Sequence, residues 1–220
     1  GMVGVIAASH IIESLNLTQL GTVMDENFPA VALIQNEVPR HPVRVYQGDG
    51  IGVFTAEIQF EKEQDIAFGS TVLEWFRVGG FDQLIIIDGI LKPEKQIQGE
   101  GLFAVGANAV ARDRLKSLDL QTIQRGIVSG ITGFLLSEGD RLNLDITALL
   151  SEASLMYPDV RAAAVAIEAI TEMTGKEIPL SAMLENARSI EQSVQEIIES
   201  ATPLLPSPDD DDAINDPSFG

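Results

Sequence analysis

The sequence predicts a three-layer α/β domain with a mostly parallel central sheet. Segments in which apolar residues recur at helical spacing alternate with short β-rich segments, an order typical of layered α/β domains. One segment, DQLIIIDG at residues 82–89, is a short apolar run bounded by turn residues, as expected of a strand covered on both faces. No internal repeat interrupts this order, so we expect one domain of ordinary size with an appendage.

The first half of the chain predicts a helix, a group of strands and a second helix. Apolar residues recur at helical spacing over residues 3–15, which predicts the first helix. The turn signals NFP, PRHP and GDG then separate β-rich segments. We place these strands near residues 20–25, 30–35, 43–47 and 51–59, and the second helix at about 63–78.

The second half continues the alternation. Besides residues 82–89, the segments LFAVGA and LNLDITALL predict strands near residues 102–107 and 142–150. Helices fit about 107–117, 130–138, 160–174 and 180–199. The last helix is amphipathic, with an apolar seam at spacings of four and three: Met183, Ala187, Ile190, Val194 and Ile197. Such a seam serves the pairing of helices between copies and packing on the same domain equally well, so both interpretations stay open.

Composition divides the chain into three parts. We expect an α/β core at residues 1–178, a C-terminal helix at 179–200 and a disordered tail at 201–220. The tail holds four prolines and a run of four aspartates, which is typical of a flexible extended segment. Its last residues, Ser218, Phe219 and Gly220, are either a frayed end or a docking hook that binds a partner through one aromatic side chain.

The charge balance is strongly acidic, with 14 basic and 33 acidic residues and a net charge of −19. Five of the acids lie in the last twenty residues, so the excess is spread over the body as well. Nucleic acid is not expected as a partner, because its phosphates would be repelled. Dense surface carboxylate fits a halophilic protein in a high-salt cytoplasm, where charges are screened, or serves solubility alone.

Other compositional features exclude several classes of site. The chain has no cysteine, which rules out disulfides, thiolate zinc sites, Fe–S ligation and a cysteine nucleophile. There is no signal peptide and no run of about 18 apolar residues, so we expect a cytoplasmic protein without a membrane partner.

The motifs of common enzymes are absent from the sequence. His10 and His41 stand alone without metal-ligand spacing, and neither G-x-S-x-G nor G-x-x-x-x-G-K-[ST] occurs. The Gly1–Gly4 segment opens a helix and has the form of an anion cradle, but no lysine is near. Spacing alone does not bring acidic pairs such as Asp140 and Asp145 together. We therefore expect no catalytic residue, metal or cofactor.

Asp159 is the acidic residue with the most informative surroundings. Pro158 disfavours a helical backbone at Tyr157, so the next helix begins after it and Asp159 occupies the N-cap position. Its carboxylate can accept a hydrogen bond from the backbone N–H of Arg161 or Ala162 and complements the helix dipole. This pattern favours a helix cap over a catalytic carboxylate.

Several stretches, in this order, resemble the proteasome assembly chaperone family. They are GMVGVIAASHIIESLNLTQLGTV, FPAVALIQNEVPRHPVRVY, VLEWFRVGGFDQLIIIDGI, GIVSGITGFLL and SEASLMYPDVRAAAVAIEAITEMTGKEIPLSAMLENARSIEQ. The last is the most specific, with Glu152 followed by Tyr157, Pro158 and Asp159 before an amphipathic helix. Archaeal members begin with a strand and a Gly-Pro-Gly-x-x-Gly turn, so with Gly1 and Gly4 this chain would begin inside that turn, its first core strand missing.

The resemblance implies a nucleoside-phosphorylase-like α/β fold, self-association, and binding to proteasome α-subunits or the core particle rather than catalysis. Some archaeal members engage the core particle through a C-terminal hydrophobic–tyrosine–any motif. Here Phe219 replaces the tyrosine and Ser218 the hydrophobic residue, which implies weak docking at best. The alternatives are an ATP-grasp-like carboxylate–amine ligase or another small-molecule enzyme, although only five lysines are present to hold a triphosphate, and an interaction module for an unrelated partner.

Overall fold

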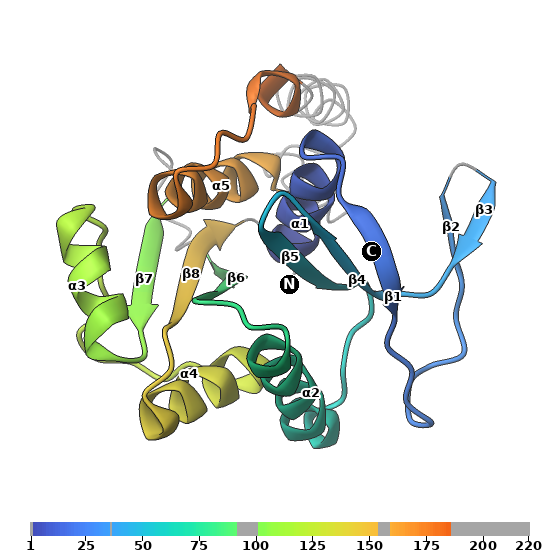
Figure 1. Cartoon of the computed structure of the whole chain (residues 1–220), viewed down its shortest axis with the longest axis horizontal. Helices are drawn as coiled ribbons and strands as arrows, with labels where there is room; N and C mark the ends of the chain where they lie inside the picture. Colours follow the sequence, from blue (N-terminus) through green and yellow to red (C-terminus); the bar gives the residue numbers. More distant parts are fainter. Residues whose placement is uncertain (1, 36, 92–100, 154–158, 186–220) are drawn as a thin grey trace, which may run out of the picture.

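A computed structural model describes residues 2–35, 37–91, 101–153 and 159–185 of the chain (Figure 1). In chain order, the elements are α1 (Met2–Ser14), β1 (Thr18–Thr22), β2 (Leu33–Gln35), β3 (Val38–Arg40), β4 (Val43–Gly48), β5 (Ile51–Ala56), the short 3-10 helix η1 (Lys62–Gln64), α2 (Asp65–Val78), β6 (Leu84–Leu91), β7 (Leu102–Gly106), α3 (Ala109–Ser117), α4 (Gly130–Leu142), β8 (Ile146–Ala153) and α5 (Val160–Thr174). Residues 181–185, where the C-terminal helix was predicted, are helical as well.

The strands form three small sheets. One has the order β1-β4-β5 and is antiparallel throughout, β2 and β3 form an antiparallel hairpin, and the third has the order β6-β8-β7. In the third sheet, β6 and β8 are parallel and β7 is antiparallel to β8. The α/β class is thus confirmed, but the expectation of a mostly parallel central sheet is wrong for the described strands.

The length of one connection explains the mixed sheet. About ten residues separate β6 from β7, and a parallel return needs a crossover of a dozen or more residues. The chain therefore turns back, and β7 runs opposite to β6. Two helices, α3 and α4, lie between β7 and β8 and bring the chain back so that β8 starts beside the end of β7, with Thr147 opposite Gly106.

Helices cover both faces of the strands (Figure 1). On one face, α1 and α5 pack against each other, α1 also contacts β5 and β6, and α5 contacts β8. On the other face, α2 packs against α4, and α4 contacts β8. The central strand β8 is buried from Ile146 to Glu152 because helices lie above and below it.

The helices that face the sheet do so through small or branched apolar residues. On α5 the buried side chains are mostly alanines, with Ile167 and Ile170 as the large exceptions. Alanine lets a helix backbone approach its neighbours closely, and the longer isoleucines fill the space that remains. Val3, Ala7 and Ile11 form the corresponding buried stripe of α1.

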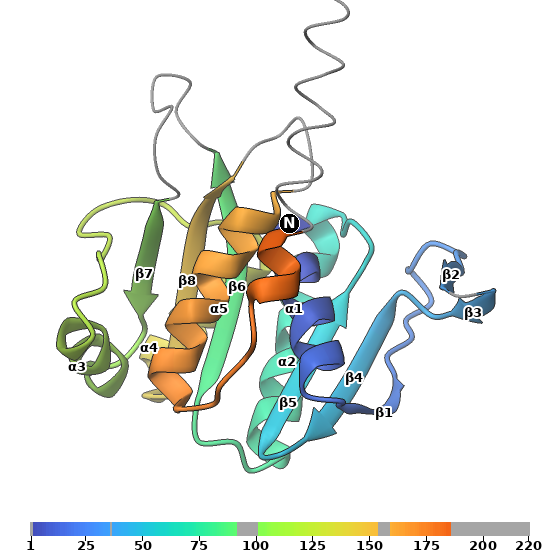
Figure 2. The same cartoon turned by 90° about the horizontal axis from the view of Figure 1, so that it is seen from above.

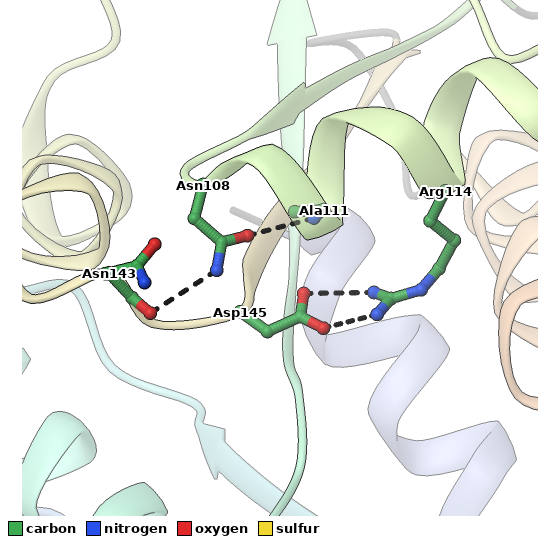
Figure 3. Close-up of polar contacts among 5 residues, drawn as sticks. All are labelled: Asn108, Ala111, Arg114, Asn143 and Asp145. Atoms are coloured by element: carbon green, nitrogen blue, oxygen red, sulfur yellow. Dashed lines mark hydrogen bonds and ion pairs between the residues drawn. The ribbon is translucent and has the colours of Figure 1, made fainter.

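A polar cluster fixes the amino end of β8 (Figure 3). Asn108 caps α3, because its side-chain oxygen accepts a hydrogen bond from the backbone N–H of Ala111 at 2.9 Å. Its side-chain N–H donates a hydrogen bond to the backbone carbonyl of Asn143 at 3.4 Å. Asn143 is the C-cap residue of α4 and adopts the left-handed conformation. The guanidinium of Arg114 makes a two-pronged ion pair with the carboxylate of Asp145. These contacts join α3 to the loop between α4 and β8.

Within the described ranges, no helix combines the length and hydropathy that crossing a bilayer requires.

Candidate functional site

Gly4 lies in α1 where the helix crosses β6. A Cβ atom built on Gly4 would lie 2.6 Å from the carbonyl oxygen of Ile87, closer than real Cβ contacts allow. Glycine is therefore required for the helix to lie directly on the strand. This contact gives Gly4 a packing role in place of the anion-binding role considered from the sequence. Gly1 lies outside the described residues.

Glu152 and Asp159 lie at or just beyond the carboxyl end of β8, near which α1 also begins. Glu152 is 6% exposed and stands opposite Ile90 of β6 in the parallel register. Its backbone N–H donates to the carbonyl oxygen of Gly101 at 2.8 Å. Asp159 opens α5, the helix that follows β8. Ligands of α/β domains usually bind at the carboxyl ends of the strands, so these two carboxylates are candidates for a ligand site. Tyr157 and Pro158 lie outside the described residues.

A third carboxylate on this side, Asp88 of β6, has a structural role. One of its oxygens accepts from the backbone N–H of Gly89 at 2.8 Å, and the other accepts from the hydroxyl of Thr132 at 2.9 Å. Thr132 is 5% exposed and lies on α4, so the pair fastens that helix to the strand. The carboxylate is used to hold two elements together.

The N-cap predicted for Asp159 is confirmed. Its Oδ1 accepts a hydrogen bond from the backbone N–H of Ala162 at 3.0 Å. Replacing Asp159 with alanine is expected to lower the free energy of unfolding by about 1 kcal/mol, because an N–H of the first turn loses its acceptor. Asp159→Asn, which keeps a capping oxygen, should retain most of that stability. Urea unfolding of both variants tests this, and an alanine variant as stable as the wild type would contradict it.

The remaining ionisable candidates make structural contacts. The Nε2 of His10 donates to the carbonyl oxygen of Pro179 at 2.6 Å, which ties α1 to the segment after α5. Asp145 is paired with Arg114, a contact that joins α3 to the start of β8. Among the residues that the structure describes, no group of three or more His, Asp or Glu is placed to hold a metal ion.

The hairpin β2–β3 projects from the rest of the molecule (Figure 2). Ile34 and Val38 on its two strands are exposed. Among the described residues, five of the eleven exposed large hydrophobic residues fall between residues 20 and 38: Leu20, Met24, Val31, Ile34 and Val38. We call these five residues the hairpin surface. Ile34, at the centre of β2, is 67% exposed. Exposed apolar residues on a projecting element, here Ile34 and Val38, are typical of a surface that binds another protein.

Buried and half-buried arginines hold the hairpin in place. Arg44 of β4 is 3% exposed, and its guanidinium donates to the side-chain oxygen of Gln35 at 3.1 Å and pairs with Glu57. Arg40 of β3 donates to the side-chain oxygen of Gln19 on β1 at 3.2 Å. These hydrogen bonds attach the hairpin to the β1-β4-β5 sheet, and such attachment lowers the entropic cost of binding a partner.

Most of the C-terminal residues singled out from the sequence lie outside the described part of the chain. Met183 is described, and it is 5% exposed within the core of its own domain, near Ile178. Ala187, Ile190, Val194 and Ile197 lie outside the described residues, as do Ser218, Phe219 and Gly220. The seam and the tail therefore stay predictions.

Sequence reasoning missed the hairpin surface as a candidate site. The segment between β1 and β4 has a readable signal, because apolar residues there are mixed with Pro39 and Pro42, and proline within a β-rich segment indicates an edge strand. An apolar edge strand that no other element covers is exposed by necessity. Whether another element covers this edge strand depends on the tertiary structure and cannot be predicted from a local sequence pattern.

Comparison with known proteins supports the fold described above. An uncharacterized protein of Methanocaldococcus jannaschii is 24% identical over 214 residues, which span 93% of this chain and 84% of that protein. Pyrococcus furiosus PbaA, described as an archaeal homolog of proteasome-assembly chaperone, superposes with a TM-score of 0.84 at 24% identity, over 92% of this chain and 84% of its own. Pyrococcus furiosus PbaB, described as an archaeal proteasome activator, gives 0.73 at 22% identity, over 89% and 88%.

A family model settles the relationship that the sequence stretches indicated. The model of the PAC2 family matches residues 1–198, which include every described element and all six residues of the family motif from Gly1 to Asp159. The chain belongs to the PAC2 family.

Proposed function

We propose that this chain is a non-enzymatic proteasome assembly chaperone-like protein, which self-associates and binds proteasome α-subunits or the core particle. The observation that carries the proposal is membership of the PAC2 family across residues 1–198. The two Pyrococcus furiosus proteins with this fold, one an assembly-chaperone homolog and the other a proteasome activator, support proteasome-related partners.

The hairpin surface supports a role in protein binding. It is apolar, it projects from the molecule, and arginine hydrogen bonds attach the hairpin to the β1-β4-β5 sheet. Residues 28–43, which hold Val31, Ile34 and Val38, contain one acid, Glu37, and one base, Arg40, so this part of the surface is neutral in a chain of net charge −19. Asp25 and Glu26 lie next to Met24, so the proposed contact is centred on the hairpin strands. Two copies of so acidic a chain repel each other least where they meet through neutral surface. We therefore assign the hairpin surface to self-association.

Replacing Ile34 with glutamate is expected to weaken self-association by tenfold or more, because a carboxylate would be placed in an apolar contact. The matched control is Ile127→Glu, which introduces the same charge at a residue that is 97% exposed and lies outside the hairpin. Size-exclusion chromatography with light scattering measures the oligomer. Equal behaviour of the two variants would remove the hairpin from the interface.

Binding to the proteasome is tested by copurification with α-subunits and with the core particle at high salt. Failure to recover either would count against the proposed function, and calorimetric binding of ATP or phosphate would favour the small-molecule enzyme instead. Deleting Ser218, Phe219 and Gly220 tests the tail separately. We propose that the tail contributes weakly, so the deletion should reduce affinity for the core particle, and unchanged affinity would exclude it from the interface.

A further inference from the structure

A polar cavity of about 290 Å³ lies between helix α1, the β1-β4-β5 sheet and strand β2 of the hairpin. Helix α1 lines it with Ser9, Ile12 and Glu13, which share one face of the helix because Ile12 and Glu13 follow Ser9 by three and four positions. Gln35 of β2 lines the side of the hairpin. A water molecule takes about 30 Å³ in the liquid, so the space suits a ligand of about ten non-hydrogen atoms. We call it the hairpin cavity.

Strands β4 and β5 supply the floor of the hairpin cavity. Arg44 and Tyr46 share one face of β4, because they are two residues apart, and Thr55 of β5 stands opposite Arg44 in the antiparallel register. All three residues are buried and line the cavity. The hydroxyl groups of Tyr46 and Thr55 can each donate a hydrogen bond. The floor is therefore rich in donors.

One of these donors has no acceptor within the described part of the chain. The guanidinium of Arg44 donates to the side-chain oxygen of Gln35 and pairs with Glu57, but its Nε–H is buried and unpaired. Buried polar groups in proteins are almost always hydrogen-bonded, so this N–H calls for an acceptor oxygen. A carboxylate is the strongest acceptor for a guanidinium, because both groups are ionised.

The charges around the hairpin cavity disfavour a ligand that is only an anion. Glu57 already neutralises Arg44, and the exposed Glu13 adds a negative charge to the lining. A second carboxylate would be repelled by Glu13 unless the same molecule also carried a positive charge. An ammonium group would supply that charge and pair with Glu13. A carboxylate and an ammonium on one small carbon skeleton are the chemistry of an α-amino acid.

We propose that the hairpin cavity binds a small α-amino acid with an uncharged side chain. The carboxylate of the ligand accepts hydrogen bonds from the Nε–H of Arg44 and from the hydroxyls of Tyr46 and Thr55, and its ammonium group donates to Glu13. Because the cavity is bounded by α1 and by strand β2, the bound ligand ties the hairpin to the body of the domain. The proposal concerns a small-molecule ligand and does not depend on the proteasome-related partner.

The test measures the binding of alanine, serine and threonine to the whole chain by isothermal titration calorimetry. Three probes of similar size each lack part of the proposed chemistry: propionate has no ammonium, ethylamine has no carboxylate, and glycerol has neither. At least one amino acid is expected to bind tenfold or more tightly than every one of these probes. Equal binding of any probe would overturn the proposal. Absence of binding by all three amino acids at millimolar concentration would also overturn it, since the Nε–H of Arg44 would then be satisfied by water alone.

Replacing Glu13 with glutamine is expected to weaken binding of the amino acid about tenfold, because a charge-assisted hydrogen bond becomes an ordinary one. The control Glu74→Gln makes the same change at an exposed residue of α2, outside the lining of the cavity, and should leave binding unchanged. Amide hydrogen exchange locates the ligand, which should slow exchange in residues 33–40 severalfold and leave α3 unaffected. Equal affinities of the two variants, or unchanged exchange in the hairpin, would overturn the proposed site.

Discussion

Replacing Ile167 with alanine is expected to lower the free energy of unfolding by about 2–5 kcal/mol. Ile167 is fully buried at the centre of α5 and belongs to the core between α5, α1 and β8. The substitution removes three carbon atoms from contact with their neighbours and leaves a cavity. Chemical denaturation followed by circular dichroism measures the loss.

The surroundings of Ile167 place this variant toward the upper part of that range. Its neighbours on the buried face of the helix are alanines, including Ala163, Ala164 and Ala166, whose side chains cannot extend into the space that is vacated. The cost of such substitutions rises with the volume that stays empty. Ile127→Ala is the matched control, because Ile127 is 97% exposed and should change stability by less than about 0.5 kcal/mol. Similar losses at the two positions would contradict the packing of α5.

Local patterns predicted most helices well, because their signals lie within the helix itself. The helix predicted at 160–174 is α5 (Val160–Thr174), fixed at its start by the cap of Asp159 and at its end by Gly175 in the left-handed conformation. The strand predicted at 142–150 begins later, at Ile146, because α4 runs to Leu142 and ends at Asn143. Asparagine often ends helices, so the end of α4 at Asn143 could have been predicted from the sequence.

Strand pairing could not be read from the same patterns. The apolar runs of β6 and β8 do belong to a parallel pair, but a strand covered on both faces has the same composition in a mixed sheet. The strand β3 was missed because Pro39 lies at its centre, and proline is tolerated there only because β3 pairs on one side.

In the candidate site, too, contacts between residues close in the sequence were predictable and contacts between distant residues were not. The cap of Asp159 was predictable because the donor lies three residues away, whereas the packing of Gly4 on Ile87 joins residues that are far apart in the sequence. The hairpin surface depends on which elements are left uncovered, and that is decided by the whole fold.

Replacing Arg44 with methionine is expected to lower the free energy of unfolding by about 3–5 kcal/mol, a loss comparable to that at Ile167. Arg44 is 3% exposed and is paired with Glu57, whose side chain is 17% exposed. Methionine fills much of the space, so the loss comes mainly from the largely covered carboxylate of Glu57, which is left without its cation. The amide oxygen of Gln35 loses its donor as well, which should also loosen the hairpin.

The double variant Arg44→Met/Glu57→Gln separates charge from packing. It is expected to recover much of the lost stability, because replacing both members of a buried ion pair by neutral groups is often nearly neutral, whereas removing one is not. Lys116→Met is the control, since the pair of Lys116 with Asp113 is exposed and contributes little. If the double variant is no more stable than Arg44→Met, the guanidinium acts through its contacts with Gln35 and Tyr46, and the ion pair with Glu57 contributes little to stability.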